Sequence, residues 1–159
     1  MSKNAMMVCL DGSKHAEEIL PIVRDLSGCV AGVITLFVAI DEPTMFTAPH
    51  LSANKNDNAV DDMFNAKTGD EQLRAMGYME TIAGPLREEG FNVKCSTGIG
   101  QASKAIISYA REKDVKIIAI ATKGHAGLKR WLFGSVADEV LKDAGRPVLI
   151  LKSREQGKQ

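Results

Sequence analysis

Two glycines and a serine that could hold a phosphate group lie in residues 117–140, together with a third glycine. The stretch opens with a short apolar run bounded by polar residues, which is typical of a strand buried on both faces. Gly124, Gly127 and Gly134 follow, and Gly134 and Ser135 directly precede apolar residues at helical spacing. Backbone N–H groups converge at such a turn, and the dipole of the following helix favours negative charge. The pattern predicts an anion-binding turn at a helix N-terminus, with Gly127 serving turn geometry alone.

The spacing of these residues differs from two common phosphate-binding motifs. Neither G-x-x-x-x-G-K-[ST] nor G-x-G-x-x-G occurs in the chain. The chain has Ala121, then two residues, Gly124, nine residues and Gly134-Ser135. This spacing closely resembles the nucleotide-binding signature of the universal stress protein family. That signature reads Gly, two residues, Gly, nine residues, Gly and then Ser or Thr, so Ala121 is the one departure. The resemblance covers nearly the whole chain, apart from a variable stretch after Asp41.

The resemblance implies a site for ATP, AMP or another adenine nucleotide, with Mg²⁺ or Mn²⁺ held mainly by the phosphates. Asp11 matches the family's aspartate, which lies against adenine and ribose. Val38 or Ala39, with the register open by one residue, is expected to contact adenine mainly through its backbone. The full set of expected nucleotide-binding residues is Asp11, Gly12, Ser13, Val38, Ala39, Ala121, Thr122, Gly124, Gly134, Ser135 and Val136.

Structural roles that need no ligand also fit several of these residues. Asp11 could cap the first helix or its turn. Ser135, with Asp138 three residues later, has the pattern of an N-cap, although a capping hydroxyl can also donate to a phosphate. Gly124 and Gly134 could simply supply positive φ angles, but their spacing favours phosphate binding. A cationic rim or an ordinary solvated surface would equally explain Lys123, His125, Lys129 and Arg130.

The segments between the expected strands carry mainly helical patterns. Residues 14–27 have one apolar helical face with Pro21 inside it, so a kink is expected there. Residues 41–69 contain prolines and many Asn and Asp residues, which predicts a long variable loop. Thr68 and Glu71 form a capping box that is expected to open a long helix. The predicted buried stripe of that helix is Leu73, Met76, Ile82, Ala83 and Leu86.

Five strands are expected to alternate with four helices, which predicts an α/β fold with a mainly parallel sheet. The strands are residues 6–10, 33–40, 91–96, 115–121 and 148–151, with 91–96 nearer a sheet edge. A ligand of such an open sheet binds at the carboxyl ends of the strands, where strand order reverses. The resemblance implies an open five-stranded parallel sheet with helices on both faces and the order 3-2-1-4-5, an adenine nucleotide alpha hydrolase-like arrangement. Residues 1–152 are expected to form one universal-stress-protein-like domain, followed by a polar tail, 153–159.

Charge and cysteine content argue against several classes of partner. The chain carries 20 Lys and Arg against 20 Asp and Glu, so no net charge favours nucleic acid or an anionic membrane. Cys9, Cys29 and Cys95 show neither a disulfide framework nor metal-ligand spacing. No apolar run approaches the roughly 20 residues of a membrane span, and the first residues do not resemble a signal peptide. A cytoplasmic location is expected.

The sequence contains no evident catalytic constellation. His15, His50 and His125 lie on different segments without metal-ligand spacing, and G-x-S-x-G is absent. The leading hypothesis is an ATP-binding stress-response regulatory protein that acts as a switch rather than a fast enzyme. A nucleotide-free dimeric interaction protein of the same family is the first alternative, for which Ala121 is the residue-level argument. A slow ATPase on the same scaffold is the second.

The last expected strand predicts how two copies would associate. Val148 to Leu151 is short and apolar, and an exposed sheet edge invites pairing with another chain. The resemblance implies that the last strands pair antiparallel in an isologous contact. A homodimer is therefore expected, together with a downstream protein that the sequence does not identify.

Overall fold

Ten helices and strands make up the parts of the chain that the computed structural model describes, residues 4–29, 32–42, 57–123 and 133–153. They alternate as the sequence pattern predicts. In chain order they are β1 (Asn4–Leu10), α1 (Lys14–Glu17), α2 (Leu20–Ser27), β2 (Val33–Ile40), α3 (Asp57–Glu88), β3 (Asn92–Ile99), α4 (Ala102–Glu112), β4 (Ile117–Lys123), α5 (Ser135–Asp143) and β5 (Val148–Ser153).

The strands form one open sheet in the order β3-β2-β1-β4-β5, and every neighbouring pair is parallel. The predicted order 3-2-1-4-5 is confirmed, as is the edge position of β3. Met7 of β1 stands between Thr35 of β2 and Ile118 of β4. Strand order therefore reverses between β1 and β4, which is where an open α/β sheet places its ligand.

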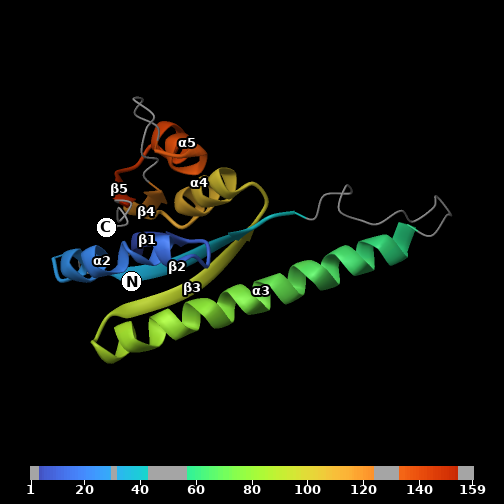
Figure 1. Cartoon of the computed structure of the whole chain (residues 1–159), viewed down its shortest axis with the longest axis horizontal. Helices are drawn as coiled ribbons and strands as arrows, with labels where there is room; N and C mark the ends of the chain where they lie inside the picture. The colour runs from blue at the N-terminus through green and yellow to red at the C-terminus, as the bar shows by residue number, and fades with distance from the viewer. Residues whose placement is uncertain (1–3, 30–31, 43–56, 124–132, 154–159) are drawn as a thin grey trace, which may run out of the picture.

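The central strands are apolar on both sides because helices cover both faces of the sheet (Figure 1). Val8 and Leu10 of β1 belong to a core that also takes in side chains of α1, α2 and α3. Met7 and Cys9, which point the other way, belong to a second core with α4 and α5. The strand ends are thus flanked by α1 on one face and α5 on the other.

The first predicted helix, 14–27, is in fact two helices. α1 ends at Glu17, and α2 begins at Leu20 with Pro21 in its first turn. Proline lacks an N–H group and has a fixed φ angle, so it suits a helix start and interrupts a continuing helix. The expected kink at Pro21 is therefore a complete break.

The long helix was predicted to open at Thr68, and this is wrong, because α3 begins at Asp57. Residues 57–69 of the expected loop are helical, and residues 43–56 of it lie outside the described residues. Alanine, methionine and lysine upstream favour a helix, and an internal Gly69 costs only about 1 kcal/mol. The capping-box pattern therefore did not have to mark a helix start.

The predicted stripe of α3 is buried at Ala83 and Leu86, but Leu73 is 72% exposed. The N-terminal part of α3 extends beyond the sheet (Figure 1). Leu73 lies near the middle of α3, where its neighbour Gln72 donates a hydrogen bond of 3.4 Å to Thr97 of β3. β4 and β5 each run two residues beyond the expected ends, and Ser153 therefore belongs to β5 rather than to a tail. In the described parts of the chain, no helix is long and apolar enough to cross a membrane.

Candidate functional site

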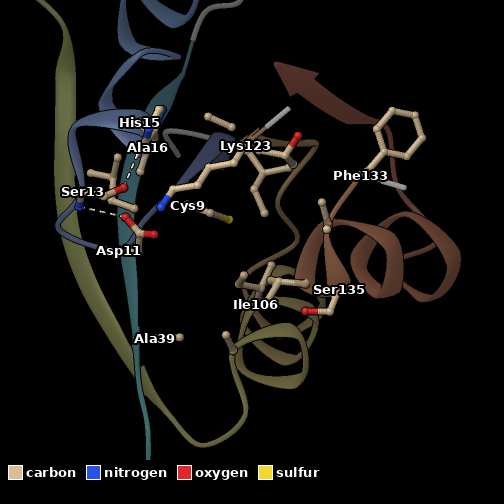
Figure 2. A pocket seen from close by; sticks show the side chains of 18 of the residues that line it. Cys9, Asp11, Ser13, His15, Ala16, Ala39, Ile106, Lys123, Phe133 and Ser135 are labelled. Atoms are coloured by element: carbon tan, nitrogen blue, oxygen red, sulfur yellow. Dashed lines mark hydrogen bonds between the residues drawn. The ribbon is translucent and has the colours of Figure 1, made fainter. Parts of the chain in front are cut away.

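A pocket of about 390 Å³ opens at the carboxyl ends of β1, β2 and β4, between α1 and α5. Figure 2 shows its two polar sides, with Asp11 and Ser13 on one and Ser135 on the other. The parallel strands bring these segments together although they are more than 100 residues apart in the sequence. The sequence prediction that Asp11 and the glycine-rich turn share one crevice agrees with this arrangement for Gly134 and Ser135.

Asp11 anchors the turn between β1 and α1. Its Oδ1 accepts a hydrogen bond of 2.8 Å from the Ser13 N–H. Ser13 is in turn the N-cap of α1, because its hydroxyl accepts a bond of 3.2 Å from the Ala16 N–H. Gly12 has φ +82 and shapes the turn without lining the pocket. Asp11 Oδ2 has no hydrogen-bond partner among the described residues, so Asp11 can fill both its structural role and a ligand-binding one.

On the α5 side of the pocket lies a helix N-terminus that has no side-chain cap among the described residues. Gly134, not Ser135, is the N-cap residue, which corrects the capping role predicted for Ser135. Gly134 has φ +87 and ψ 153, a conformation that is essentially confined to glycine. Ser135 is the first residue of α5, and its hydroxyl points into the pocket (Figure 2). The first N–H groups of α5 are therefore available to an anion.

Thr122 contributes a buried hydroxyl group to the wall of the pocket. It alternates with Ile118 and Ile120 along β4 and so faces α4 and α5. Thr122 is 9% exposed, and its Oγ1 has no hydrogen-bond partner among the described residues. An unpaired buried hydroxyl costs about 1–3 kcal/mol, so a polar ligand atom at this position would be stabilising.

The remaining wall of the pocket is apolar. Phe37, Ala39 and Ile106 line it together with Ala102. Val38 does not line the pocket, because its side chain belongs to the core on the opposite face. Of the two registers left open by the sequence, the structure favours Ala39. An apolar wall facing two polar ends suits a ligand with a flat hydrophobic part and an anionic part.

The structure brings together most of the predicted site residues, and it adds others. Asp11, Ser13, Ala39, Ala121, Thr122, Gly134, Ser135 and Val136 all line the pocket. Gly124 lies outside the described residues, as do His125, Gly127, Lys129 and Arg130. Sequence reasoning missed Phe37, Ile106 and Phe133 as lining residues. Strand alternation from Ala39 could have found Phe37, but nothing in the local sequence marks Ile106 or Phe133.

Cys9 and His15 are two of the titratable residues that line the pocket. Cys9 lines the pocket, but burial raises the pKa of its thiol to about 12, which leaves it un-ionised near neutral pH. His15 is exposed, and its Nδ1 lies 3.1 Å from Oε1 of Glu18, the C-cap residue of α1. Among the described residues, no three His, Cys, Asp or Glu side chains cluster in a way that could hold a metal ion.

Comparison with known proteins assigns the chain and its fold to a family. The sequence model described as "Universal stress protein family" matches residues 4–152. The chain belongs to the universal stress protein family. Universal stress protein MJ0577 of Methanocaldococcus jannaschii is 29% identical over 151 residues, covering 91% of each chain. A solved structure of MJ0577 has a TM-score of 0.73 at 26% identity and covers 98% of this chain and 100% of that one.

Two further universal stress proteins share the fold at lower identity. The UspA structure from Lactobacillus plantarum has a TM-score of 0.70 at 18% identity, covering 95% of this chain and 99% of its own. A universal stress protein solved in complex with cAMP has a TM-score of 0.55 at 15% identity, covering 95% and 98%. The open sheet and its helices are thus the family's fold.

Proposed function

We propose that this universal stress protein binds an adenine nucleotide, with ATP as the leading ligand, in the pocket between α1 and α5. Binding serves as a regulatory switch in a stress response rather than as a step of fast turnover. The observation that carries the proposal is that one pocket joins Asp11 to the N-terminus of α5, where the N-cap residue Gly134 has no side chain to cap the helix. The N–H groups at this helix N-terminus call for an anionic ligand group at that end of the pocket.

The two ends of the pocket give the nucleotide its orientation. The phosphates lie against the N–H groups of the first turn of α5, which Gly134 leaves accessible. The base lies along the apolar wall of Phe37, Ala39 and Ile106. The free Oδ2 of Asp11 then accepts a hydrogen bond from the ribose or the exocyclic amine. Mg²⁺ or Mn²⁺ binds mainly through the phosphates, which supply oxygen ligands of the kind these ions prefer.

The structure around Ala121 supports nucleotide binding over the nucleotide-free alternative. Ala121 lies within β4 and is not among the described residues with positive φ. Its methyl group packs with the core on the α1–α3 face, away from Thr122. The departure from the glycine signature therefore introduces neither backbone strain nor a large group beside the phosphates.

Two further features belong to the same proposal. β5 is an edge strand whose apolar residues Val148 to Leu151 remain only half-buried, which suits a homodimer formed by antiparallel pairing of the two β5 strands. The protein acts in the cytoplasm through a downstream partner whose chemistry the pocket does not define.

Mass spectrometry of the ligand released from freshly purified protein tests the proposed function. We expect ATP or a related adenine nucleotide at near one equivalent per chain, and turnover far slower than nucleotide binding. Since a relative with this fold was solved with cAMP, cAMP belongs among the standards. Release of no nucleotide, followed by no binding of added ATP, AMP or cAMP, would favour the nucleotide-free interaction protein. Rapid turnover of ATP would favour the enzyme.

A further inference from the structure

Gly98 of β3 lies directly behind the apolar wall of the pocket. It pairs with Ala39, which lines the pocket from β2. A Cβ atom at position 98 would be 2.7 Å from Phe37 Cζ and 3.2 Å from Ala105 Cβ. Gly98 is not among the glycines with positive φ, so this position requires glycine for space rather than for backbone conformation.

The Phe37 ring occupies the space that the missing side chain leaves. Phe37 is 1% exposed, and its ring centroid lies 4.9 Å from that of Tyr109 on α4. The ring therefore has Gly98 against its edge and packs with Tyr109 of α4, while it also lines the pocket. Close packing of this kind leaves the ring little freedom to move except toward the pocket.

The geometry points to Gly98 as a positioning residue that sets the size of the base-binding end of the pocket, acting through Phe37. This inference rests on the proposed function, which places the base against Phe37, Ala39 and Ile106. Because Gly98 has no side chain, the Phe37 ring can pack close to β3. The space that remains in the pocket beside the ring then limits the size of the base that can bind.

A side chain at position 98 would change only one end of the pocket. A methyl group forces the Phe37 ring toward the ligand or moves α4 outward, because the 2.7 Å approach is shorter than carbon atoms tolerate. The three atoms nearest to this methyl group belong to Phe37 and Ala105, and none of them belongs to α5 or to Thr122. ATP and adenosine should therefore lose affinity by the same factor, since they share the base and differ only in the phosphates.

Titration of ATP, adenosine and etheno-ATP, whose base carries an extra fused ring, tests this inference on three variants. We expect Gly98→Ala to weaken ATP and adenosine alike by about tenfold, the effect of one misplaced methyl-sized group in an apolar pocket. Adding Phe37→Leu to Gly98→Ala should restore ATP binding, which a general folding defect would not allow. Phe37→Leu alone should shift the ratio of etheno-ATP to ATP affinity in favour of the larger base.

Gly77→Ala is the matched control, because Gly77 lies on α3, outside the pocket, and a Cβ atom added there would have open space within 4 Å. It should leave all three affinities unchanged.

If wild type binds ATP but Gly98→Ala binds it equally well, or if Phe37→Leu leaves the affinity ratio unchanged, the inference is overturned while the proposed function stands. If wild type binds neither ATP nor adenosine, both fail. If Gly98→Ala does not fold, the ratio of etheno-ATP to ATP affinity in Phe37→Leu alone decides whether the inference holds.

Discussion

Replacing Gly134 by alanine probes the phosphate end of the pocket with a single methyl group. Gly134 has φ +87 and ψ 153, and a Cβ atom added there meets no described atom within 4 Å. The effect of Gly134→Ala is therefore one of backbone conformation and not of crowding within the protein. A non-glycine residue held in this region costs about 1–3 kcal/mol.

This cost appears in one of two measurable ways. If the turn keeps its conformation in the variant, the free energy of unfolding falls by about 1–3 kcal/mol. If the turn relaxes instead, ATP must restore the strained conformation on binding, and its affinity falls by about 5-fold to 150-fold. If the turn keeps its conformation, the new methyl group also lies where the phosphates approach the backbone. We therefore expect weaker ATP binding whether the turn keeps its conformation or relaxes.

Isothermal titration with ATP, combined with urea unfolding, measures both quantities. Gly90→Ala is the matched control, because Gly90 has φ +96 and an equally open Cβ position but lies at the end of α3, away from the pocket. Gly90→Ala should lose stability by about 1–2 kcal/mol and keep wild-type ATP affinity. Wild-type ATP affinity in Gly134→Ala would refute the assignment of the phosphates to this turn.

Three further outcomes are expected. Thr122→Val should weaken ATP binding by up to about tenfold and leave the free protein equally or more stable. Thr35→Val, which removes the other buried hydroxyl without a described partner, should change stability alone. Equal ATP affinity in both variants would contradict a ligand contact at Thr122. Leu151→Glu should convert a β5-paired dimer to monomer in sedimentation, while Lys94→Glu on the opposite sheet edge should not. A dimer that survives Leu151→Glu would place the contact elsewhere. Ala121→Gly should tighten ATP binding by less than about tenfold, and ATP binding that appears only in Ala121→Gly would assign the natural protein to the nucleotide-free branch.

The sheet was predictable from the sequence because its strands are short apolar runs separated by clear turn signals. Alternation of strands and helices gave a parallel sheet, whereas its order came from the glycine signature that ends at Gly134 and Ser135. The start of α3 was not predictable, because the capping box at Thr68 and Glu71 is a local pattern that a longer helix can contain. Leu73 follows the apolar spacing of α3, but its side chain is 72% exposed in the structure.

The polar ends of the site were likewise easier to predict than its apolar wall. Asp11 and Ser135 sit at the ends of strong local patterns, a strand and a helix, and so could be placed at the crevice. Strand alternation places Phe37 on the same face as Ala39, but the space for its ring comes from Gly98, in a strand 61 residues later. This contact between distant segments leaves no trace in either segment's own pattern.

The central claim is that one pocket binds an adenine nucleotide with its phosphates at the N-terminus of α5. Isothermal titration of wild-type protein with ATP, AMP and adenosine in the presence of Mg²⁺ tests it most directly. The account predicts saturable binding of one ATP per chain, with affinity falling in the order ATP, AMP, adenosine as phosphate contacts to α5 are lost. Absence of ATP binding, or equal affinity for ATP and adenosine, would contradict it.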